Sequence, residues 1–242
     1  MISKSQIKLI TSLQQKKHRN KLGLFVAEGP KVIQELFEAG LEIEALYVAD
    51  SELFTDRCPV IISDKELAKI SFLKNANNAI AVFKIIKKKK LSDENLTVVL
   101  DAIRDPGNLG TIIRLCDWFG VEQLVCSEDT VDCYNPKVIQ ATMGSISRVN
   151  VSYVDLSDYL NETNLPIYVG LMNGENIYKQ KLAKKAIIVL GNEANGVSEN
   201  ILKIATNKIT IPRFGNLQKT ESLNVATATA ILLSEFKRTI EL

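Results

Sequence analysis

The sequence predicts an α/β protein with two domains, the second of which contains a mostly parallel β-sheet covered by helices on both faces. From Leu96 onward, short apolar runs alternate with segments of helical periodicity, which is typical of parallel sheets. Before that point, a shorter set of helices and strands indicates a small α/β domain. Four consecutive lysines at 87–90, followed by small polar residues, are typical of a linker. We therefore expect domains at residues 1–90 and 91–242.

The first domain has clear helix signals. Ser63 and Glu66 have the spacing of a capping box, and Pro30 suits the first position of a helix. The elements expected there are helices at 3–13, 30–40 and 64–70 and strands at 25–29, 43–48, 60–62 and 79–86.

The second domain alternates regularly. The strands expected are 96–100, 123–126, 148–151, 166–171, 186–190 and 207–211. The helices expected are 108–119, 135–141, 155–160, 197–204 and a last helix that starts near Ser222, whose hydroxyl is the expected cap. Small side chains in this last helix predict a tightly packed, buried position.

Composition excludes several classes of protein. No apolar run is long enough to span a bilayer, and the N-terminus lacks a signal pattern, so a cytoplasmic location without membrane contact is expected. The four cysteines show no metal-ligand spacing and are expected to be reduced. With His18 as the single histidine, the sequence predicts neither a metal site nor a histidine-based triad.

Charge divides unevenly along the chain. Residues 1–90 carry a net charge of +6 and residues 91–242 a net charge of −4, which together give +2. The basic half suggests contact with a polyanion. Its densest cluster, expected either to bind phosphates or to be a solvated face, contains Lys16, Lys17, Arg19 and Lys21.

A first candidate site directly follows the strand that begins the second domain. Gly107 and Gly110 allow a ligand to approach the backbone, and Arg114 can hold a phosphate with two hydrogen bonds. The glycine spacing is G-x-x-G, and no acidic residue ends the next strand. These two features argue against a nicotinamide dinucleotide site, and so against a small-molecule oxidoreductase.

Two further polar segments come later in the chain. Glu193 lies between Gly191 and Gly196 after a buried strand, a position that is hard to explain structurally. Ser222 and Asn224 lie where a loop meets the last helix. Ligand sites in parallel sheets lie beyond the carboxyl ends of the strands, which makes the segment at Glu193 a second candidate. The segment at Ser222 and Asn224 is either a helix cap with solvated neighbours or a third candidate.

In order, the motifs D-P-x-N-x-G-x-x-x-R, L-G-x-E-x-x-G and I-P…S-L-N resemble the three motifs of the SpoU (TrmH) family. Members of this family are S-adenosylmethionine-dependent RNA ribose 2′-O-methyltransferases of the SPOUT superfamily. The stretch 16–35, with F-V-A-E-G-x-x-V-I-x-E, resembles the family's N-terminal substrate-binding domain, which has a ribosomal-protein-like fold. The resemblance therefore covers the whole chain.

This resemblance implies a deep trefoil knot in the second domain, a bent cofactor, and a homodimer with its active site near the interface. By motif position, it implies that cofactor binding involves Leu171, Gly191, Gly196, Ile211 and Leu223, and that the catalytic set is Asn108, Arg114, Glu193, Ser222 and Asn224. The segment between Pro212 and Ser222 is longer than in common members, which leaves the position of residues 218–220 open.

The predicted function is methylation of a ribose 2′-hydroxyl in RNA, without a metal. The separate N-terminal domain favours 23S ribosomal RNA as the substrate, with transfer RNA and a non-catalytic RNA-binding scaffold as alternatives. A free guanidinium stays protonated. Arg114 therefore either acts as a base helped by an RNA phosphate, or fixes phosphate and hydroxyl while the proton leaves to water or Glu193.

Overall fold

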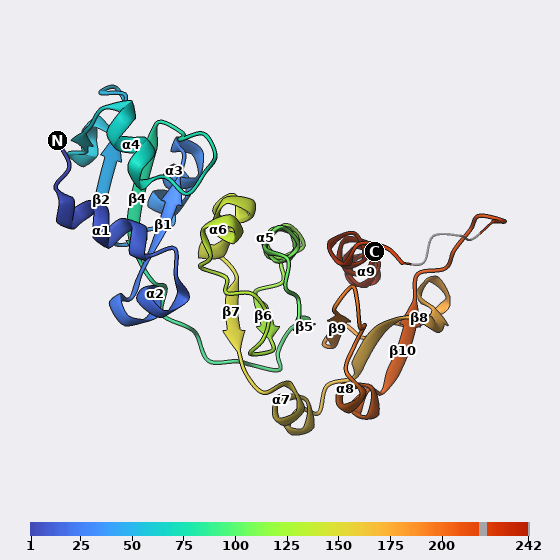
Figure 1. The fold of residues 1–242 in the computed structure, drawn as a ribbon. Helices are drawn as coiled ribbons and strands as arrows, with labels where there is room; N and C mark the ends of the chain where they lie inside the picture. The colour runs from blue at the N-terminus through green and yellow to red at the C-terminus, as the bar shows by residue number, and fades with distance from the viewer. Residues whose placement is uncertain (218–221, 242) are drawn as a thin grey trace. The chain divides into compact units, whose positions relative to one another are not determined.

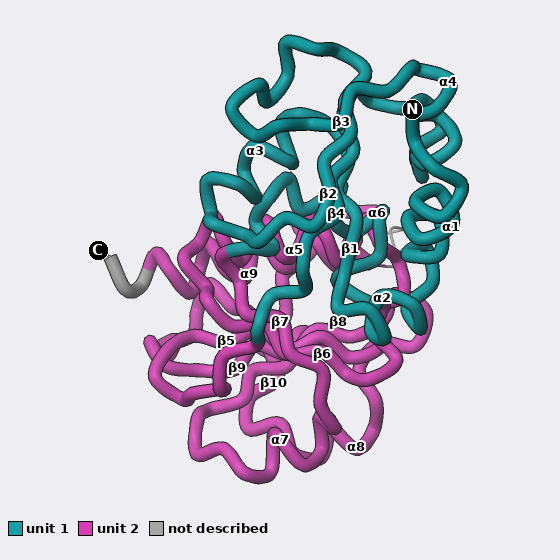
Figure 2. The backbone as a smooth tube through the Cα atoms, turned by 90° about the vertical axis from the view of Figure 1, so that its left-hand side faces the viewer, with its two compact units in different colours: residues 1–87, 132–147 teal, residues 88–131, 148–242 magenta. Residues whose placement is uncertain are grey.

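Figure 1 shows the chain in a computed structural model, which describes residues 1–217 and 222–241, without the side chains of 239–241. The backbone forms two compact units. Unit 1 contains residues 1–87 and 132–147, and unit 2 contains residues 88–131 and 148–242 (Figure 2). The predicted linker lysines therefore lie where the chain first leaves unit 1.

Unit 1 is built on a four-stranded sheet with the order β1-β4-β2-β3. Strands β1 and β2 are antiparallel to β4, and β3 is parallel to β2. The strands are β1 (Leu24–Glu28), β2 (Ile43–Val48), β3 (Val60–Ile61) and β4 (Ala79–Lys84). The helices within residues 1–87 are α1 (Lys4–Ser12), α2 (Lys16–Leu22), α3 (Pro30–Glu38), η1 (Thr55–Arg57) and α4 (Asp64–Ile70).

The helix starts in this unit follow the local sequence signals. Ser63 and Glu66 form the predicted capping box of α4, and Ser3 and Gln6 form a second one for α1. Gly23 ends α2 in the left-handed conformation with φ +67°, which glycine adopts without steric cost.

The stretch 132–147 returns to unit 1 and carries α6 (Pro136–Thr142) and η2 (Ser145–Ser147). Helix α6 packs on β1. The ring of Tyr134 lies 4.9 Å from that of Phe25, and the backbone nitrogen of Ile86 donates to the Tyr134 hydroxyl at 3.2 Å. The sequence prediction had grouped this helix with residues 91–242, because local periodicity does not reveal contacts between distant segments.

Unit 2 contains a six-stranded, fully parallel sheet with the order β10-β8-β9-β5-β6-β7. The strands are β5 (Thr97–Asp101), β6 (Gln123–Cys126), β7 (Asn150–Tyr153), β8 (Ile167–Asn176), β9 (Ile187–Gly191) and β10 (Asn207–Thr210), and the helices are α5 (Pro106–Trp118), α7 (Leu156–Glu162), η3 (Ile177–Lys179), α8 (Glu199–Ile204) and α9 (Val225–Glu241). Helices α5 and α9 cover one face and α7 and α8 the other (Figure 1). The predicted parallel α/β architecture is confirmed.

The core of unit 2 explains why its strands are almost wholly apolar. Strands β5 and β9 are the central pair and are buried along most of their length, with Val99 and Val189 in one apolar cluster with α7 and α8. On the other face, Phe236 of α9 packs edge-on against Tyr168 at 5.1 Å. This rigid centre fixes the loops at the carboxyl ends of the strands. Among the described residues, no helix has the length and apolar character needed to cross a membrane.

Candidate active site

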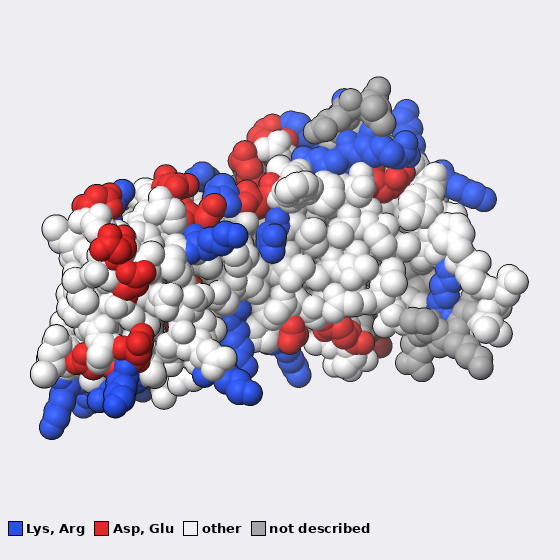
Figure 3. All heavy atoms as spheres, turned by 90° about the horizontal axis from the view of Figure 1, so that it is seen from above, with Lys and Arg blue, Asp and Glu red and all other residues white. Residues whose placement is uncertain are grey.

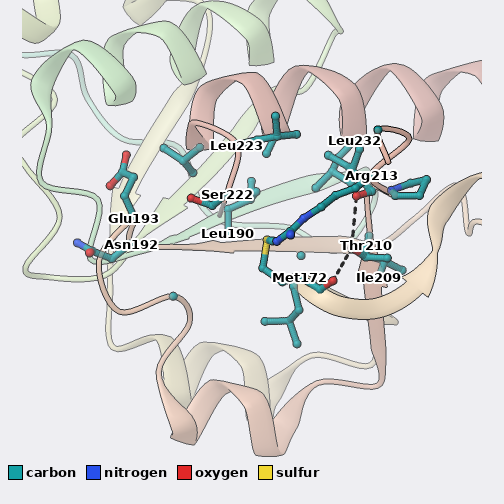
Figure 4. Close-up of a pocket in the computed structure, with 18 of the residues that line it drawn as sticks. Met172, Leu190, Asn192, Glu193, Ile209, Thr210, Arg213, Ser222, Leu223 and Leu232 are labelled. Atoms are coloured by element: carbon teal, nitrogen blue, oxygen red, sulfur yellow. Dashed lines mark hydrogen bonds between the residues drawn. The ribbon is translucent and has the colours of Figure 1, made fainter. Parts of the chain in front are cut away.

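A pocket of about 1340 Å³ lies at the carboxyl edge of the parallel sheet (Figure 4). It is lined by residues of β8, by the ends of β9 and β10 with the segments that follow them, and by the first half of α9. Its walls are largely apolar, with Leu190, Ile209 and Leu232 among them. Of the sequence-predicted site residues, those that line it are Leu171, Glu193, Gly196, Ile211, Ser222 and Leu223. A pocket at this edge is where ligands bind in parallel α/β sheets.

Gly191 is not in the pocket lining but shapes the loop that borders it. A side-chain carbon at this position would overlap backbone atoms of Gly196 and Val197. The close approach is maintained by two hydrogen bonds, from Asn192 N to Gly196 O at 3.0 Å and from Gly196 N to Asn192 O at 2.8 Å. Gly196 itself has φ +67°. Glycine is therefore favoured at position 191 by the close backbone approach and at position 196 by the positive φ angle.

Asn192 lines the pocket and was not predicted as a site residue. Its side-chain nitrogen donates to the carbonyl of Ala102 at 2.7 Å, and its side-chain oxygen accepts from Ala194 N at 2.8 Å. Ala102 has φ +58°, which is uncommon for a residue other than glycine. Asn192 thus ties the loop after β9 to the loop after β5. The sequence feature that could have identified Asn192 is its amide side chain directly after Gly191, the last residue of β9.

Asn108 links the three predicted motifs. It lies in the first turn of α5, where the Asp105 carboxylate caps its backbone nitrogen at 2.7 Å. Its side-chain nitrogen donates to Glu193, and its side-chain oxygen accepts a hydrogen bond from Asn224 at 2.9 Å. One amide therefore joins segments after β5, after β9 and before α9. The helix starts at Pro106, two residues before the predicted start, so Asn108 is the third residue of α5.

Asn224 caps the last helix, a role that the sequence prediction gave to Ser222. The Asn224 side-chain oxygen accepts from Ala226 N at 2.9 Å and Thr227 N at 3.3 Å. With its side-chain nitrogen on Asn108, both ends of the amide are used. Ser222 instead lines the pocket. Asparagine is as good a cap as serine, so propensity alone could not separate the two positions.

Arg114 lies away from this cluster. It is exposed on α5, six residues after Asn108, which corresponds to about 9 Å along the helix axis and about 120° around it. Within the part of the chain that the structure describes, its guanidinium makes no hydrogen bond or ion pair. The structure thus brings together Asn108, Glu193 and Asn224, but not Arg114.

The basic segment of unit 1 forms α2, and one of its predicted phosphate contacts is wrong. Arg19 is only 2% exposed; it pairs with Asp132 and donates to the carbonyls of Leu13 and Gln14, each at 2.8 Å. Its guanidinium therefore holds this unit together and is not available to a phosphate. Exposed side chains of α2 that remain candidates are those of Lys16, Lys17 and Lys21.

The charged surface is mixed on the face drawn in Figure 3, where acidic and basic side chains lie interspersed with uncharged areas. Among the described residues, no group of three or more His, Cys, Asp or Glu side chains could hold a metal ion. Residues 218–220, whose position the sequence left open, lie outside the described residues, as does Glu221.

Comparison with known proteins assigns both parts of the chain. Residues 95–234 match the SpoU rRNA Methylase family, and residues 4–81 match the MRM3-like substrate binding domain. The 23S rRNA (guanosine(2553)-2′-O)-methyltransferase RlmP of Bacillus subtilis is 28% identical, over 91% of this chain and 91% of that protein.

Two solved structures share the fold over almost the whole chain. A TrmH-family protein from Porphyromonas gingivalis is 34% identical with a TM-score of 0.88, covering 98% of this chain and 99% of the other. An AdoMet-bound rRNA methyltransferase from Sinorhizobium meliloti is 26% identical with a TM-score of 0.85, covering 100% and 98%.

Proposed function

Because this chain belongs to the SpoU rRNA methylase family, we propose that it transfers a methyl group from S-adenosylmethionine to a ribose 2′-hydroxyl of 23S ribosomal RNA. The observation that carries the proposal is the link that Asn108 makes between Glu193 and Asn224 beside a large apolar pocket. A cofactor pocket next to a cluster of hydrogen-bonding side chains is the arrangement that a transfer reaction needs.

The pocket suits S-adenosylmethionine in size and chemistry. Its volume exceeds what a ligand of this size needs, and apolar side chains on both sides can enclose an adenine ring. We propose that Leu171, Ile211 and Leu223 contact the cofactor, and that Gly191 and Gly196 bring the backbone of the β9 loop close to it. When bound, the cofactor supplies a methyl group on a positively charged sulfur, which makes a metal unnecessary for activation.

The protein's own task is to position the ribose hydroxyl and to accept its proton. Asn108 donates to Glu193, which holds that exposed carboxylate in a fixed orientation at the edge of the pocket. We propose that Arg114 binds an RNA phosphate next to the target ribose, and that the proton leaves to water or to Glu193. A guanidinium that stays protonated is well suited to holding a phosphate and poorly suited to acting as a base. Ser222 and Asn224 complete the proposed catalytic set.

Residues 1–90 are proposed to bind the RNA. The match of residues 4–81 to a substrate binding domain supports this role, and so does the match to the Bacillus subtilis relative, which covers 91% of this chain. Exposed lysines of α2, namely Lys16, Lys17 and Lys21, are the proposed phosphate contacts. A cytoplasmic location is part of the same proposal, as is the trefoil knot in unit 2.

We also propose that the protein acts as a homodimer. Trp118 at the end of α5 is 84% exposed, and Phe214 and Leu217 near the pocket are each 81% exposed. Burial of these side chains between two chains would remove their apolar surface from water, and aromatic residues are enriched at protein–protein interfaces. Light scattering after size-exclusion chromatography tests this point: wild type is expected at twice the chain mass, and a stable Trp118→Glu variant at the mass of one chain.

The function is tested with S-adenosylmethionine carrying a tritiated methyl group and total RNA from a source that lacks the activity. Label is expected in large ribosomal RNA, within a dinucleotide that resists alkali because its 2′-hydroxyl is blocked. Label in transfer RNA would support the proposed reaction but contradict ribosomal RNA as the substrate. Absence of both label and cofactor binding by calorimetry would overturn the proposed enzyme.

A further inference from the structure

Arg213 brings a positive charge into the pocket that the proposed function does not use. Apart from Glu193, it is the only charged residue among the described residues that line the pocket. Arg213 directly follows Pro212 in the segment that comes after β10. Figure 4 shows its side chain extending between Leu223 and Leu232 on one side and Met172 on the other. The guanidinium therefore lies within the space that a ligand would enter.

We propose that Arg213 binds the carboxylate of the methionine part of the cofactor and so selects ligands that carry it. This inference rests on the proposed function, because it concerns the same pocket. The cofactor has one anionic group, its α-carboxylate, and two cationic groups, its ammonium and its sulfonium. A carboxylate in a largely apolar pocket needs a charged or hydrogen-bonding partner.

Glu193 and Arg213, the two charged residues that line the pocket, can be paired with the charged groups of the cofactor in one consistent way. Glu193 already accepts a hydrogen bond from Asn108 at the catalytic cluster, where the reacting end of the cofactor belongs. It would repel a second carboxylate. Arg213 enters from a different loop and offers a planar fork of N–H groups, which matches a carboxylate with two hydrogen bonds. The carboxylate is therefore assigned to Arg213 by charge and by shape.

The local backbone supports a positioning role for this arginine. Pro212 has a fixed φ and restricts the residue before it, so the main chain that carries Arg213 has fewer accessible conformations than an ordinary loop. Thr210 fixes the same segment, since its hydroxyl donates to the carbonyl of Met172 at 3.1 Å. A long side chain on a restrained backbone loses less conformational entropy on binding a ligand.

The test compares two ligands by calorimetry. S-adenosylhomocysteine has the amino-acid part with its carboxylate, and 5′-methylthioadenosine lacks it but keeps the adenosine and the sulfur. Both are titrated into wild type, Arg213→Met, Arg213→Lys and Lys185→Met. Lys185 precedes β9 at the opposite edge of the sheet, where it pairs with Glu94, so its variant controls for the loss of one positive charge.

Arg213→Met is expected to weaken S-adenosylhomocysteine binding by about 10-fold or more, the usual cost of a lost charge-assisted hydrogen bond, and to leave 5′-methylthioadenosine within about 2-fold. Arg213→Lys is expected to restore part of the loss, and Lys185→Met to behave as wild type. Unchanged binding of methylthioadenosine also shows that the Met variant is folded.

Two results would overturn the inference. One is an equal loss for both ligands, which would mean that Arg213 only shapes the pocket; the other is no loss for either. The proposed function would be unaffected in both cases, because wild type would still bind both ligands. Failure of wild type to bind either ligand would overturn the proposed function and this inference together.

Discussion

Asn224 donates a 2.9 Å hydrogen bond from its side-chain nitrogen to the side-chain oxygen of Asn108, which lies 116 residues earlier in the chain. The same Asn224 caps α9 and the same Asn108 lies in the first turn of α5. The starts of two helices that pack on one face of the sheet are thereby held together beside the pocket. Because Glu193 is attached to this pair through Asn108, its orientation depends on both helix starts.

Asn108→Ala is expected to lower the transfer rate at least about 10-fold, because Glu193 and Asn224 both lose their link to α5. Binding of S-adenosylhomocysteine should change less than about 2-fold, since Asn108 does not line the pocket. Single-turnover transfer and calorimetry measure the two effects separately. The control is Asn207→Ala at the start of β10, whose side chain donates a hydrogen bond to the Thr206 hydroxyl of the same segment and takes no part in the Asn108 cluster. A parallel loss of binding and rate in Asn108→Ala would contradict the expectation.

Arg114→Ala is expected to abolish measurable transfer while it keeps cofactor binding. The side chain is exposed and outside the pocket lining, so its proposed partner is the RNA and not the cofactor. The measurement is transfer to ribosomal RNA beside a calorimetric titration with S-adenosylhomocysteine. Lys185→Ala, at the opposite edge of the sheet, removes one positive charge as a control. Turnover by Arg114→Ala at the wild-type rate would exclude this arginine from the catalytic set.

Gly191→Ala is expected to lower Tm by about 2–10 °C, because the added carbon overlaps the backbone of Gly196 and overpacking costs about 1–3 kcal/mol. Gly170→Ala is the matched control on the neighbouring strand β8. There the nearest atom would be Leu232 Cδ1 at 3.5 Å, an ordinary contact. Thermal unfolding followed by circular dichroism compares the two. Equal Tm values for both variants would show that the close approach at Gly191 relaxes without cost.

Asp132→Asn is expected to lower the free energy of unfolding by about 3 kcal/mol, since it leaves the Arg19 guanidinium buried without a counter-charge. Urea unfolding is the measurement. Asp56→Asn is the control within the same unit, because its pair with Arg57 is exposed and should contribute less than about 1 kcal/mol. If the two variants lose the same stability, the buried pair is no stronger than a surface pair.

Glu28→Gln is expected to change the pH dependence of stability. Burial raises the pKa of Glu28 above its ordinary value of 4.5. Hydrogen bonds from the Ser71 hydroxyl and from Phe72 N, both at 2.6 Å, lower the pKa but do not cancel the effect of burial. A raised carboxyl pKa means that the folded state binds the proton more tightly. The tighter proton binding stabilises the folded state at low pH. The wild-type free energy of unfolding therefore decreases as pH rises from 4.5 through the raised pKa.

Glutamine can accept from Phe72 N through its side-chain oxygen and donate to the Ser71 hydroxyl through its side-chain nitrogen, without a buried charge, so the variant should lack this decrease. Urea unfolding between about pH 4 and 8 measures the difference between wild type and Glu28→Gln. The difference is expected to grow in favour of the variant as pH rises. Parallel pH profiles of the two proteins would mean that Glu28 is not the group responsible.

Most helices and strands could be predicted because they depend on local signals. The apolar runs of β5 and β9 and the capping box at Ser63 are local features, and the structure has these elements within a few residues of their predicted bounds. The apolar pocket residues Leu171, Ile211 and Leu223 were named through the family resemblance, since neither spacing nor charge identifies them. The predicted homodimer, knot and catalytic roles stay predictions.

What could not be predicted depends on contacts between distant segments. A basic run looks the same whether its arginine faces water or an internal carboxylate, so the burial of Arg19 against Asp132 had no local signal. Asn192 was missed for a related reason: its partner, the carbonyl of Ala102, lies 90 residues away. In each case the deciding interaction joins residues far apart in the sequence.

The return of residues 132–147 to unit 1 has a consequence for the order of folding during synthesis. When residues 1–87 have been synthesised, every strand of the unit 1 sheet has been made, but neither α6 nor Asp132 has. Phe25 and the Arg19 guanidinium must then wait for about 45 more residues, at about 5–20 residues per second, before their partners Tyr134 and Asp132 are made. For several seconds the nascent chain therefore carries an incomplete first unit, and strands β5 and β6 of the parallel sheet are made before that unit is complete.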